Sequence, residues 1–207
     1  VLTFVVTIFS RYYLHREGGF KRYFSTILLF FLAYNLLVFA GNYETLFIGW
    51  EILGVCSFLL IAFYRDRYLP VKNALKVIWT YRFGDICLIL AMWMSHHLWH
   101  ENITFIKLLD PALVGEHFEE HGGYAVFITL MLLVAATVKS AQLPFSSWLP
   151  RAMEGPTTSS AIFYGSLSVH LGVFLLLRTY VYWSSVPLIQ ALLILSGIST
   201  SMITSAI

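Results

Sequence analysis

Long apolar runs, separated by short polar stretches, constrain the fold of this chain more than any other feature of its sequence. A helix needs about 20 apolar residues to cross the hydrocarbon core of a bilayer, and inside lipid only helices and closed barrels satisfy their own backbone hydrogen bonds. The sequence shows no strand-like alternation, so we expect an all-α bundle of transmembrane helices, one of them discontinuous. The expected spans are about 1–9 (partial), 23–41, 45–64, 71–94, 124–151 (broken near 140–144), 157–179 and 186–207 (partial).

The composition supports a membrane protein. The chain has 207 residues, of which 58% are hydrophobic and 12% charged, whereas soluble domains carry about 25% charged residues. The first and last apolar stretches begin or end in mid-pattern, so 1–207 is expected to be a single transmembrane domain within a longer protein. Its net charge of +2 is scattered over loops and single intramembrane positions, which gives no indication of a nucleic-acid partner. Cys56 and Cys87 fall inside apolar spans and are expected to be packing residues rather than a disulfide.

The charged loops predict an orientation in the membrane. Residues 11–22 and 65–72 are rich in arginine and lysine, and Arg151 falls on the same side. Residues 96–122 carry one lysine and several acidic side chains. Because basic loops stay on the cytoplasmic side of a membrane, we expect loops 11–22 and 65–72 in the cytoplasm and loop 96–122 outside.

Lys139 stands at mid-span in the fifth of these runs, a few residues before Pro144. An amine at this depth costs about 2.5–3.5 kcal/mol on insertion scales, so it needs a partner, water or a function. Pro144 cannot donate a hydrogen bond to the carbonyl of Ser140, and the helix is therefore expected to kink or break just after the lysine. A charge beside a broken membrane helix is typical of an ion site.

Three further ionisable side chains within the spans are candidates for the same site. Glu51 is about one turn into its span, and Arg82 and Asp85 share a helical face, where they can pair. We expect Glu51 to be the carboxylate partner of Lys139, in an ion pair that opens and closes as protons arrive. The alternative is that these charges only lock helices together, as buried pairs sometimes do, although intramembrane ionisable residues are usually functional.

Histidines and a tyrosine are weaker candidates. His96, His97 and His100 could share a zinc ion, because histidines three or four residues apart can bind one metal, but no cysteine lies nearby to complete a site. His170 could be a proton relay, since imidazole titrates near neutral pH, or a hydrogen-bonded packing residue. Tyr164 could join the same polar path or serve as a core tyrosine.

Motifs for redox and hydrolytic chemistry are missing from the sequence. No glycine-rich phosphate loop follows a strand, and there is no cysteine-rich cluster or haem attachment motif. NADH, ATP and iron–sulfur chemistry are therefore not expected in this chain, and no cofactor is assigned to it. If the chain belongs to an enzyme, it is expected to be the ion-translocating part of a translocase.

Three motifs, taken together, resemble one family. They are Phe47–Ile61 (FIGWEILGVCSFLLI), Arg82–Asp85 (RFGD) and Lys139–Thr157, which contains KSAQLP and WLPRAMEGPT. In content and order they are similar to the antiporter-like subunits of respiratory complex I and of Mrp cation antiporters. The resemblance implies that Glu51 and Lys139 form the family's glutamate–lysine pair and that Asp85, with Arg82, couples to the lysine. It also implies that protons or sodium ions pass through half-channels joined by a hydrated polar axis.

The stretch after Lys139 looks most like a divergent branch of this family, the DabB membrane subunit of the inorganic-carbon accumulation complex. That resemblance implies uptake of CO2 or bicarbonate driven by a cation gradient, in a bacterial inner membrane, with a large zinc-containing partner similar to carbonic anhydrase. The alternatives are a proton-pumping subunit of NADH:quinone oxidoreductase or an Mrp Na+/H+ antiporter, with other membrane subunits as partners, and, in another class, a passive membrane anchor. Tyr164 departs from the family's pattern, which usually has histidine there.

Overall fold

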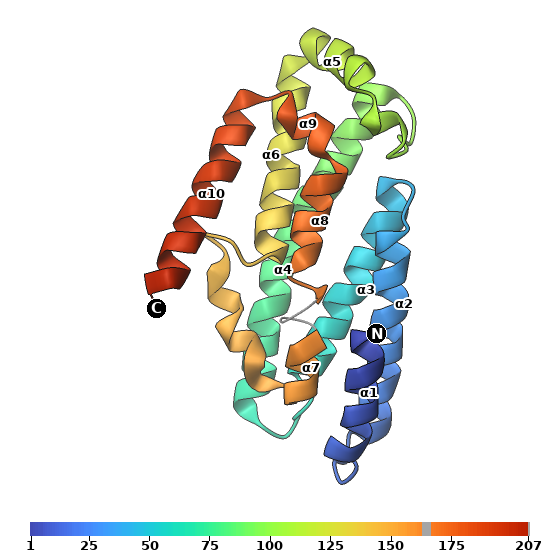
Figure 1. The fold of residues 1–207 in the computed structure, drawn as a ribbon, viewed down its shortest axis with the longest axis vertical. Coiled ribbons are helices and arrows are strands. Elements are labelled where there is room, and N and C mark those ends of the chain that lie inside the picture. The colour runs from blue at the N-terminus through green and yellow to red at the C-terminus, as the bar shows by residue number, and fades with distance from the viewer. Residues whose placement is uncertain (163–166, 207) are drawn as a thin grey trace.

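The described part of the chain is built from helices. The computed structural model describes residues 1–162 and 167–206. Within them the β-type backbone pairing consists of one isolated bridge, between Asn42 and Thr104. The expected all-α class is therefore confirmed. The long helices run roughly parallel to the long axis of the molecule (Figure 1).

Five of the described helices are long and apolar enough to cross a membrane. They are α2 (Phe20–Val38), α3 (Tyr43–Ile61), α4 (Tyr68–Trp99), α6 (Gly122–Lys139) and α10 (Pro187–Ala206). The shorter elements are α1 (Leu2–Tyr13), η1 (Lys107–Leu109), α5 (Pro111–Glu120), η2 (Ser146–Trp148), η3 (Pro150–Glu154), α7 (Thr157–Ile162), α8 (His170–Arg178) and α9 (Tyr180–Ser184). Their lengths and apolar character define a polytopic membrane bundle.

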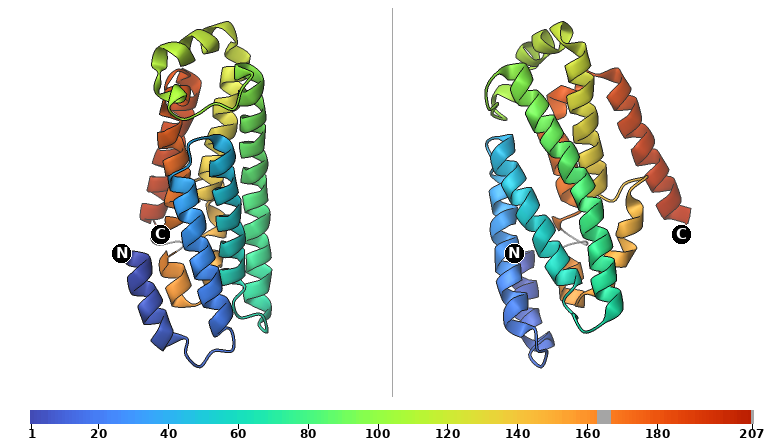
Figure 2. Two further views of the ribbon diagram at one scale, coloured as in Figure 1. Left: turned by 90° about the vertical axis from the view of Figure 1, so that its right-hand side faces the viewer. Right: turned by 180° about the vertical axis from the view of Figure 1, so that it is seen from behind.

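Small residues bring the central helices into close contact. α4 packs between α3 and α6, while α2 packs on α3 and α8 packs on α6 (Figure 2). A side-chain carbon added at Gly49 would lie 2.8 Å from Cβ of Leu37, and one added at Gly84 would lie 2.9 Å from a methyl carbon of Val138. Such close approach favours association of helices in lipid, where no hydrophobic force drives them together. α4 thus lies at the centre of the part of the bundle that carries the charges.

α6 ends at Lys139, directly before the stretch 140–144 in which the break was expected. Ala141 has φ 53, in the left-handed region. The N–H of Gln142 donates to the carbonyl of Thr137 at 2.9 Å, and the N–H of Ala141 reaches that of Val138 at 3.4 Å. These bonds make a Schellman motif, whose left-handed position is usually glycine. The expected span over 124–151 is therefore one helix to Lys139, followed by the short helices η2 and η3.

Other helix limits also differ from the expected spans. The run over 157–179 is divided between α7 and α8, with residues 163–166 outside the described part of the chain. α1 continues through Arg11, and α4 continues through His96 and His97, all expected in loops. Each of these basic residues lies in the last turn of its helix, where a cation faces the negative end of the helix dipole.

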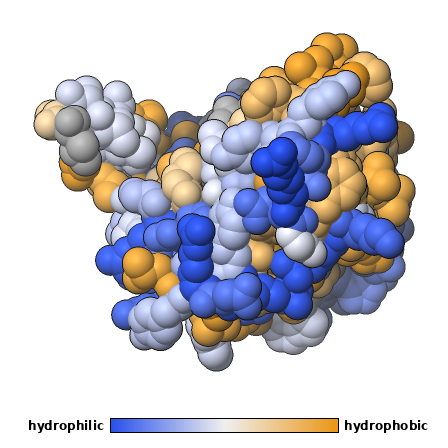
Figure 3. All heavy atoms as spheres, turned by 90° about the horizontal axis from the view of Figure 1, so that it is seen from below, coloured by the Kyte–Doolittle hydropathy of each residue, from blue (hydrophilic) through white to orange (hydrophobic). Residues whose placement is uncertain are grey.

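Polar residues gather at one end of the bundle, and at the other end an arginine binds backbone carbonyls. Hydrophilic residues gather on the end that carries the α1–α2 and α3–α4 connections (Figure 3). At the opposite end, Arg178 of α8 donates to the carbonyl oxygens of Val38 and Ala40, at 3.0 and 3.2 Å. These bonds satisfy backbone groups that the end of α2 leaves free, and they tie α8 to α2.

Candidate functional site

Lys139 is held inside the bundle at the last residue of α6. Its side chain is among the largest fully buried ones, with 1% of the residue exposed. The ammonium Nζ donates to the backbone carbonyl of Trp50 at 3.3 Å, and it lies 4.7 Å from the centre of the Trp50 ring and 4.5 Å from that of Tyr81. Aromatic faces attract cations, most strongly where water is excluded. Two rings and one carbonyl therefore form the immediate surroundings of the amine.

The carboxylates of the site meet at Arg82 of α4. Its guanidinium lies 2.6 Å from Glu51 of α3 and 3.2 Å from Asp85, one turn further along α4. The pair predicted from the spacing of Arg82 and Asp85 is thus formed. The other carboxylate oxygen of Asp85 accepts a hydrogen bond from the indole N–H of Trp50 at 2.8 Å. The side chain of Asp85 is 5% exposed, whereas those of Arg82 and Glu51 are 38% and 23% exposed.

The expected ion pair between Glu51 and Lys139 is not formed, and the prediction of that direct contact was wrong for this structure. Glu51 pairs with Arg82, and within the described residues no carboxylate oxygen lies within the 4.0 Å of an ion pair from the Lys139 amine. The reason is geometric, because a guanidinium has five donors in a planar fork and can hold two carboxylates at once. The Lys139 amine is instead linked to the carboxylates through Trp50, which binds both Lys139 and Asp85.

The end of α6 keeps its backbone groups paired despite the break. The N–H and hydroxyl of Ser140 both donate to the carbonyl of Ala136, and the indole N–H of Trp148 donates to that of Val138 at 2.9 Å. Farther on, the N–H of Leu143 donates to the hydroxyl of Thr200 in α10 at 3.0 Å. A helix can end at membrane depth only if its freed carbonyls find such partners. The break therefore places the amine of Lys139 beside the negative end of α6.

The remaining candidates lie away from this group. His170 begins α8 with an exposed side chain and makes no hydrogen bond or ion pair with the charged group described above. Tyr164 lies outside the described residues. His97 stacks on Trp93 with ring centres 6.3 Å apart and lies 6.1 Å from the ring of His100. Among the described residues no cluster of three or more histidine, cysteine, aspartate or glutamate side chains is arranged to hold a metal ion, so the zinc hypothesis gains no support.

Two aromatic residues of the site were missed from the sequence. Trp50 contacts both Lys139 and Asp85 and directly precedes Glu51, but nothing in its neighbourhood distinguished it from a core tryptophan. Tyr81 lies four residues before Asp85, and residues with that spacing share a helical face. This spacing was the available signal, because it placed the tyrosine beside the charges of α4.

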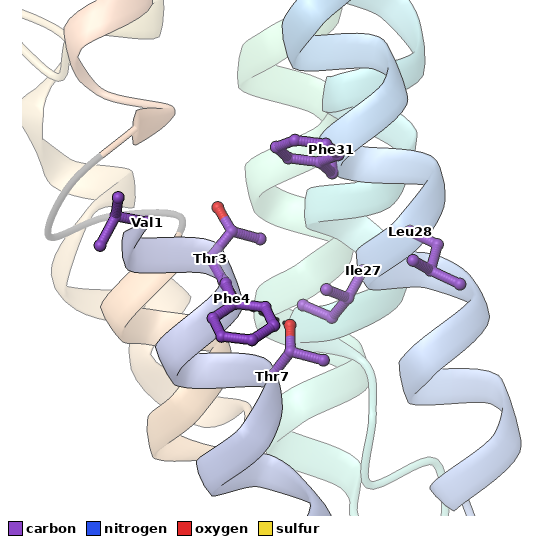
Figure 4. Close-up of a pocket in the computed structure, with 7 residues that line it drawn as sticks. All are labelled: Val1, Thr3, Phe4, Thr7, Ile27, Leu28 and Phe31. Carbon is purple, nitrogen blue, oxygen red and sulfur yellow. Dashed lines mark hydrogen bonds between the residues drawn. The ribbon is translucent and has the colours of Figure 1, made fainter.

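The bundle also has hollows away from this site. One of about 260 Å³ lies between α1 and α2 (Figure 4). The residues that line it are Val1, Thr3, Phe4, Thr7, Ile27, Leu28 and Phe31. None of these side chains is charged, and none belongs to the group around Lys139, so this hollow is separate from that site.

Fold and site together define a class: a polytopic α-helical membrane protein with a lysine buried at a broken helix and linked to carboxylates on neighbouring helices. The family profile described as "NADH:quinone oxidoreductase/Mrp antiporter, TM" matches residues 40–207. The chain belongs to this family of membrane subunits.

Its relatives come from bacteria and animals. The chain is 36% identical to NADH-quinone oxidoreductase subunit L of Buchnera aphidicola subsp. Schizaphis graminum, over 97% of its own length and 32% of the relative's. It is 35% identical to subunit L of Escherichia coli (strain K12), with the same coverage. It is 36% identical to NADH-ubiquinone oxidoreductase chain 5 of Bos indicus, over 99% of this chain and 32% of the relative. The chain therefore spans about a third of the length of these relatives.

A solved structure shares the fold. It is a chain in the structure of the Mrp complex from Dietzia sp. DQ12-45-1b, which is 30% identical and superposes with a TM-score of 0.86. The match covers 96% of this chain and 21% of that one. By name, the sequence relatives are a subunit or chain of an NADH-quinone or NADH-ubiquinone oxidoreductase, and the solved structure is that of an Mrp complex.

Proposed function

We propose that the chain is the antiporter-like part of a membrane subunit that translocates protons, or alternatively sodium ions, within a complex of the NADH:quinone oxidoreductase or Mrp type. The other membrane subunits of such a complex are its proposed partners. The names of the relatives support this function better than inorganic-carbon uptake as a DabB subunit. No relative named above carries that activity, and nothing in the site supports a zinc-containing partner.

One observation carries the proposal: a buried amine and two carboxylates are linked across three helices. Glu51 on α3 and Asp85 on α4 share Arg82, and Trp50 links Asp85 to Lys139 on α6. Charged groups at this depth are costly and usually mark an ion path. A passive anchor has no need of them.

The geometry suggests how protonation of Glu51 affects the protonation of Lys139. Glu51 is the more exposed of the two carboxylates, so a proton that enters the group from outside reaches Glu51 before Asp85. Its neutralisation releases Arg82, which then pairs with Asp85 alone, one turn away on the same helix. Asp85 and Glu51 both act electrostatically on the Lys139 amine. Each change in their pairing with Arg82 therefore changes the affinity of the amine for its proton. Lys139 would thereby exchange protons in step with Glu51.

The test is proton flux through the full-length protein in its native complex, reconstituted into liposomes with an internal pH-sensitive dye and an imposed pH gradient. Lys139→Met removes the buried amine and is expected to abolish flux, and Glu51→Gln is expected to lower it strongly. Lys72→Met is the matched control, because Lys72 also lies over a tyrosine ring, that of Tyr68 at 5.5 Å, but is exposed at the start of α4. Retained flux in Lys139→Met would overturn the proposal and favour the passive anchor. Repeating the assay with a sodium gradient distinguishes the two ions.

We also propose the orientation and the membrane. Loops 11–22 and 65–72 face the cytoplasm and loop 96–122 faces outward in a bacterial inner membrane, following the positive-inside rule and the Escherichia coli relative. Arg16→Cys and Glu119→Cys variants would be labelled in whole cells with a membrane-impermeant maleimide. Cys56 and Cys87, the cysteines of residues 1–207, are buried and give little background. Labelling of Glu119→Cys alone is expected, and the reverse result would invert the orientation.

A further inference from the structure

Two buried hydroxyl groups, one of them on a residue that contacts Lys139, have no hydrogen-bond partner among the described residues. Tyr81, whose ring face contacts the amine, is 1% exposed, and Ser168, just before α8, is 0% exposed. Neither hydroxyl makes a hydrogen bond of ordinary geometry with any described residue. The two hydroxyls nevertheless lie close enough to interact with each other. They come from α4 and from the segment just before α8, and both of these helices pack on α6.

Unpaired hydroxyls at this depth call for an explanation, since buried polar groups in folded proteins nearly always have a partner. Each hydroxyl can donate one hydrogen bond and accept two. A water molecule with two or more polar neighbours in a buried site is a regular part of protein structure. A water between Tyr81 and Ser168 would satisfy both groups and would lie next to the aromatic surroundings of Lys139.

We infer that Tyr81 and Ser168 together hold a water that passes protons between Lys139 and the start of α8. This inference rests on the proposed function and deepens it by naming the next step of the path. A proton leaving the Lys139 ammonium goes to the water, which gives a different proton to the hydroxyl of Ser168 or Tyr81. The accepting hydroxyl in turn releases its own proton to the next water. Lys139, the first water and the hydroxyl then end neutral, the positive charge moves on with the proton, and no bond other than O–H or N–H is made or broken.

The choice of Tyr81 as a relay follows from its two separate contacts. Its ring face meets the cation, and the edge of its ring meets the indole of Trp148, with ring centres 5.0 Å apart. These contacts fix the ring, so the hydroxyl at its tip has a defined position. Phenylalanine would keep both ring contacts and lose only the hydroxyl. Tyr81→Phe therefore tests the role of the hydroxyl in proton transfer while leaving the contact between the ring and the Lys139 amine in place.

The experiment is the same liposome flux assay on the full-length protein in its complex, with assembly checked for each variant. Tyr81→Phe and Ser168→Ala are each expected to lower proton flux by about tenfold, as expected when one hydrogen-bonded group of a path is lost. The double variant is expected to be no slower than the slower single one, because groups that hold one water act together. Ser168→Thr keeps the hydroxyl and is expected to restore flux. Tyr43→Phe is the matched control, since it removes another buried hydroxyl without a partner, at the far end of α3.

The outcomes separate this inference from the proposed function. If Lys139→Met abolishes flux and Tyr81→Phe and Ser168→Ala both leave it unchanged, the relay is wrong and the proposed function stands. If the losses in the two single variants multiply in the double variant, the residues act independently and the shared water is excluded. If Lys139→Met leaves flux intact, the proposed function fails whatever the hydroxyl variants do.

Discussion

α4 and α6 carry the charges of the site in opposite ways. α4 runs over 32 residues without interruption and carries an arginine and an aspartate that pair along its own face. α6 stops at its one charged residue, Lys139, and gives it no partner of its own. The difference shows that an ion pair within one helix leaves that helix continuous, whereas a single amine is accommodated by ending the helix and recruiting groups from its neighbours. The continuous helix is thus the fixed element of the site, and the broken one presents its lysine to it.

Removing the charge that α4 shares with α3 should have the largest effect on this arrangement. Arg82→Met leaves Glu51 and the buried Asp85 without their cation, and loss of one partner of a buried pair costs about 3–5 kcal/mol. Because Arg82 is 38% exposed, we expect about 2–3 kcal/mol, scaled down from that buried-pair value, together with loss of proton flux. Denaturant unfolding in detergent measures the stability. Arg65→Met, in the exposed α3–α4 connection, is the control and should change neither quantity.

Cutting the link between the two helices should have the next largest effect. Trp50→Phe keeps the backbone carbonyl and an aromatic face for Lys139 but removes the N–H that binds Asp85. A buried acceptor left without its donor costs about 1–3 kcal/mol. The same unfolding assay should show a loss in that range, and proton flux should fall while remaining measurable. Unchanged stability would mean that Arg82 alone suffices to hold Asp85.

The contact between α4 and α6 can be altered without touching a charge. Gly84→Ala places a methyl group about 2.9 Å from a methyl carbon of Val138, and such overpacking costs about 1–3 kcal/mol. The gain in helix propensity from glycine to alanine offsets about 1 kcal/mol of this, so we expect a net loss of about 1 kcal/mol. Gly115→Ala in α5 is the control, because a side chain there meets nothing within 4 Å, and it should be slightly stabilising.

The end of α6 offers the smallest change, and one of opposite sign. Ala141→Gly relieves a left-handed conformation that costs a non-glycine residue about 1–2 kcal/mol, part of which returns as entropy of the unfolded chain. We expect about 0.5–1 kcal/mol of stabilisation with unchanged flux. Ala135→Gly, inside α6, is the control and should destabilise by about 1 kcal/mol. Loss of stability in Ala141→Gly would contradict a strained helix end.

Local patterns in the sequence were enough to predict much of this molecule. Apolar run lengths predicted an all-helical membrane bundle, and the spacing of Arg82 and Asp85 predicted their pair, because both depend on residues close in sequence. The partner of Lys139 was predicted incorrectly, since which side chain reaches it depends on how three helices pack. The break was expected just after Lys139, and α6 does end at Lys139, but the left-handed residue that ends it was not foreseen, because alanine at position 141 lacks the signal that glycine gives. Ser168 was overlooked for the same reason as Trp50, because its part in the site depends on contacts between helices, whereas Tyr81 had a local signal in its spacing from Asp85.

Trp50 also sets a length scale. Its backbone carbonyl holds the amine of Lys139 and its indole nitrogen holds the carboxylate of Asp85, so the distance between two ionisable groups on different helices is bounded by the covalent dimensions of one residue. Bond lengths and angles hardly change with temperature, lipid thickness or lateral pressure, whereas the spacing of packed helices does. The electrostatic interaction between the two groups should therefore stay nearly constant across membranes of different thickness and fluidity, as long as both hydrogen bonds to Trp50 persist.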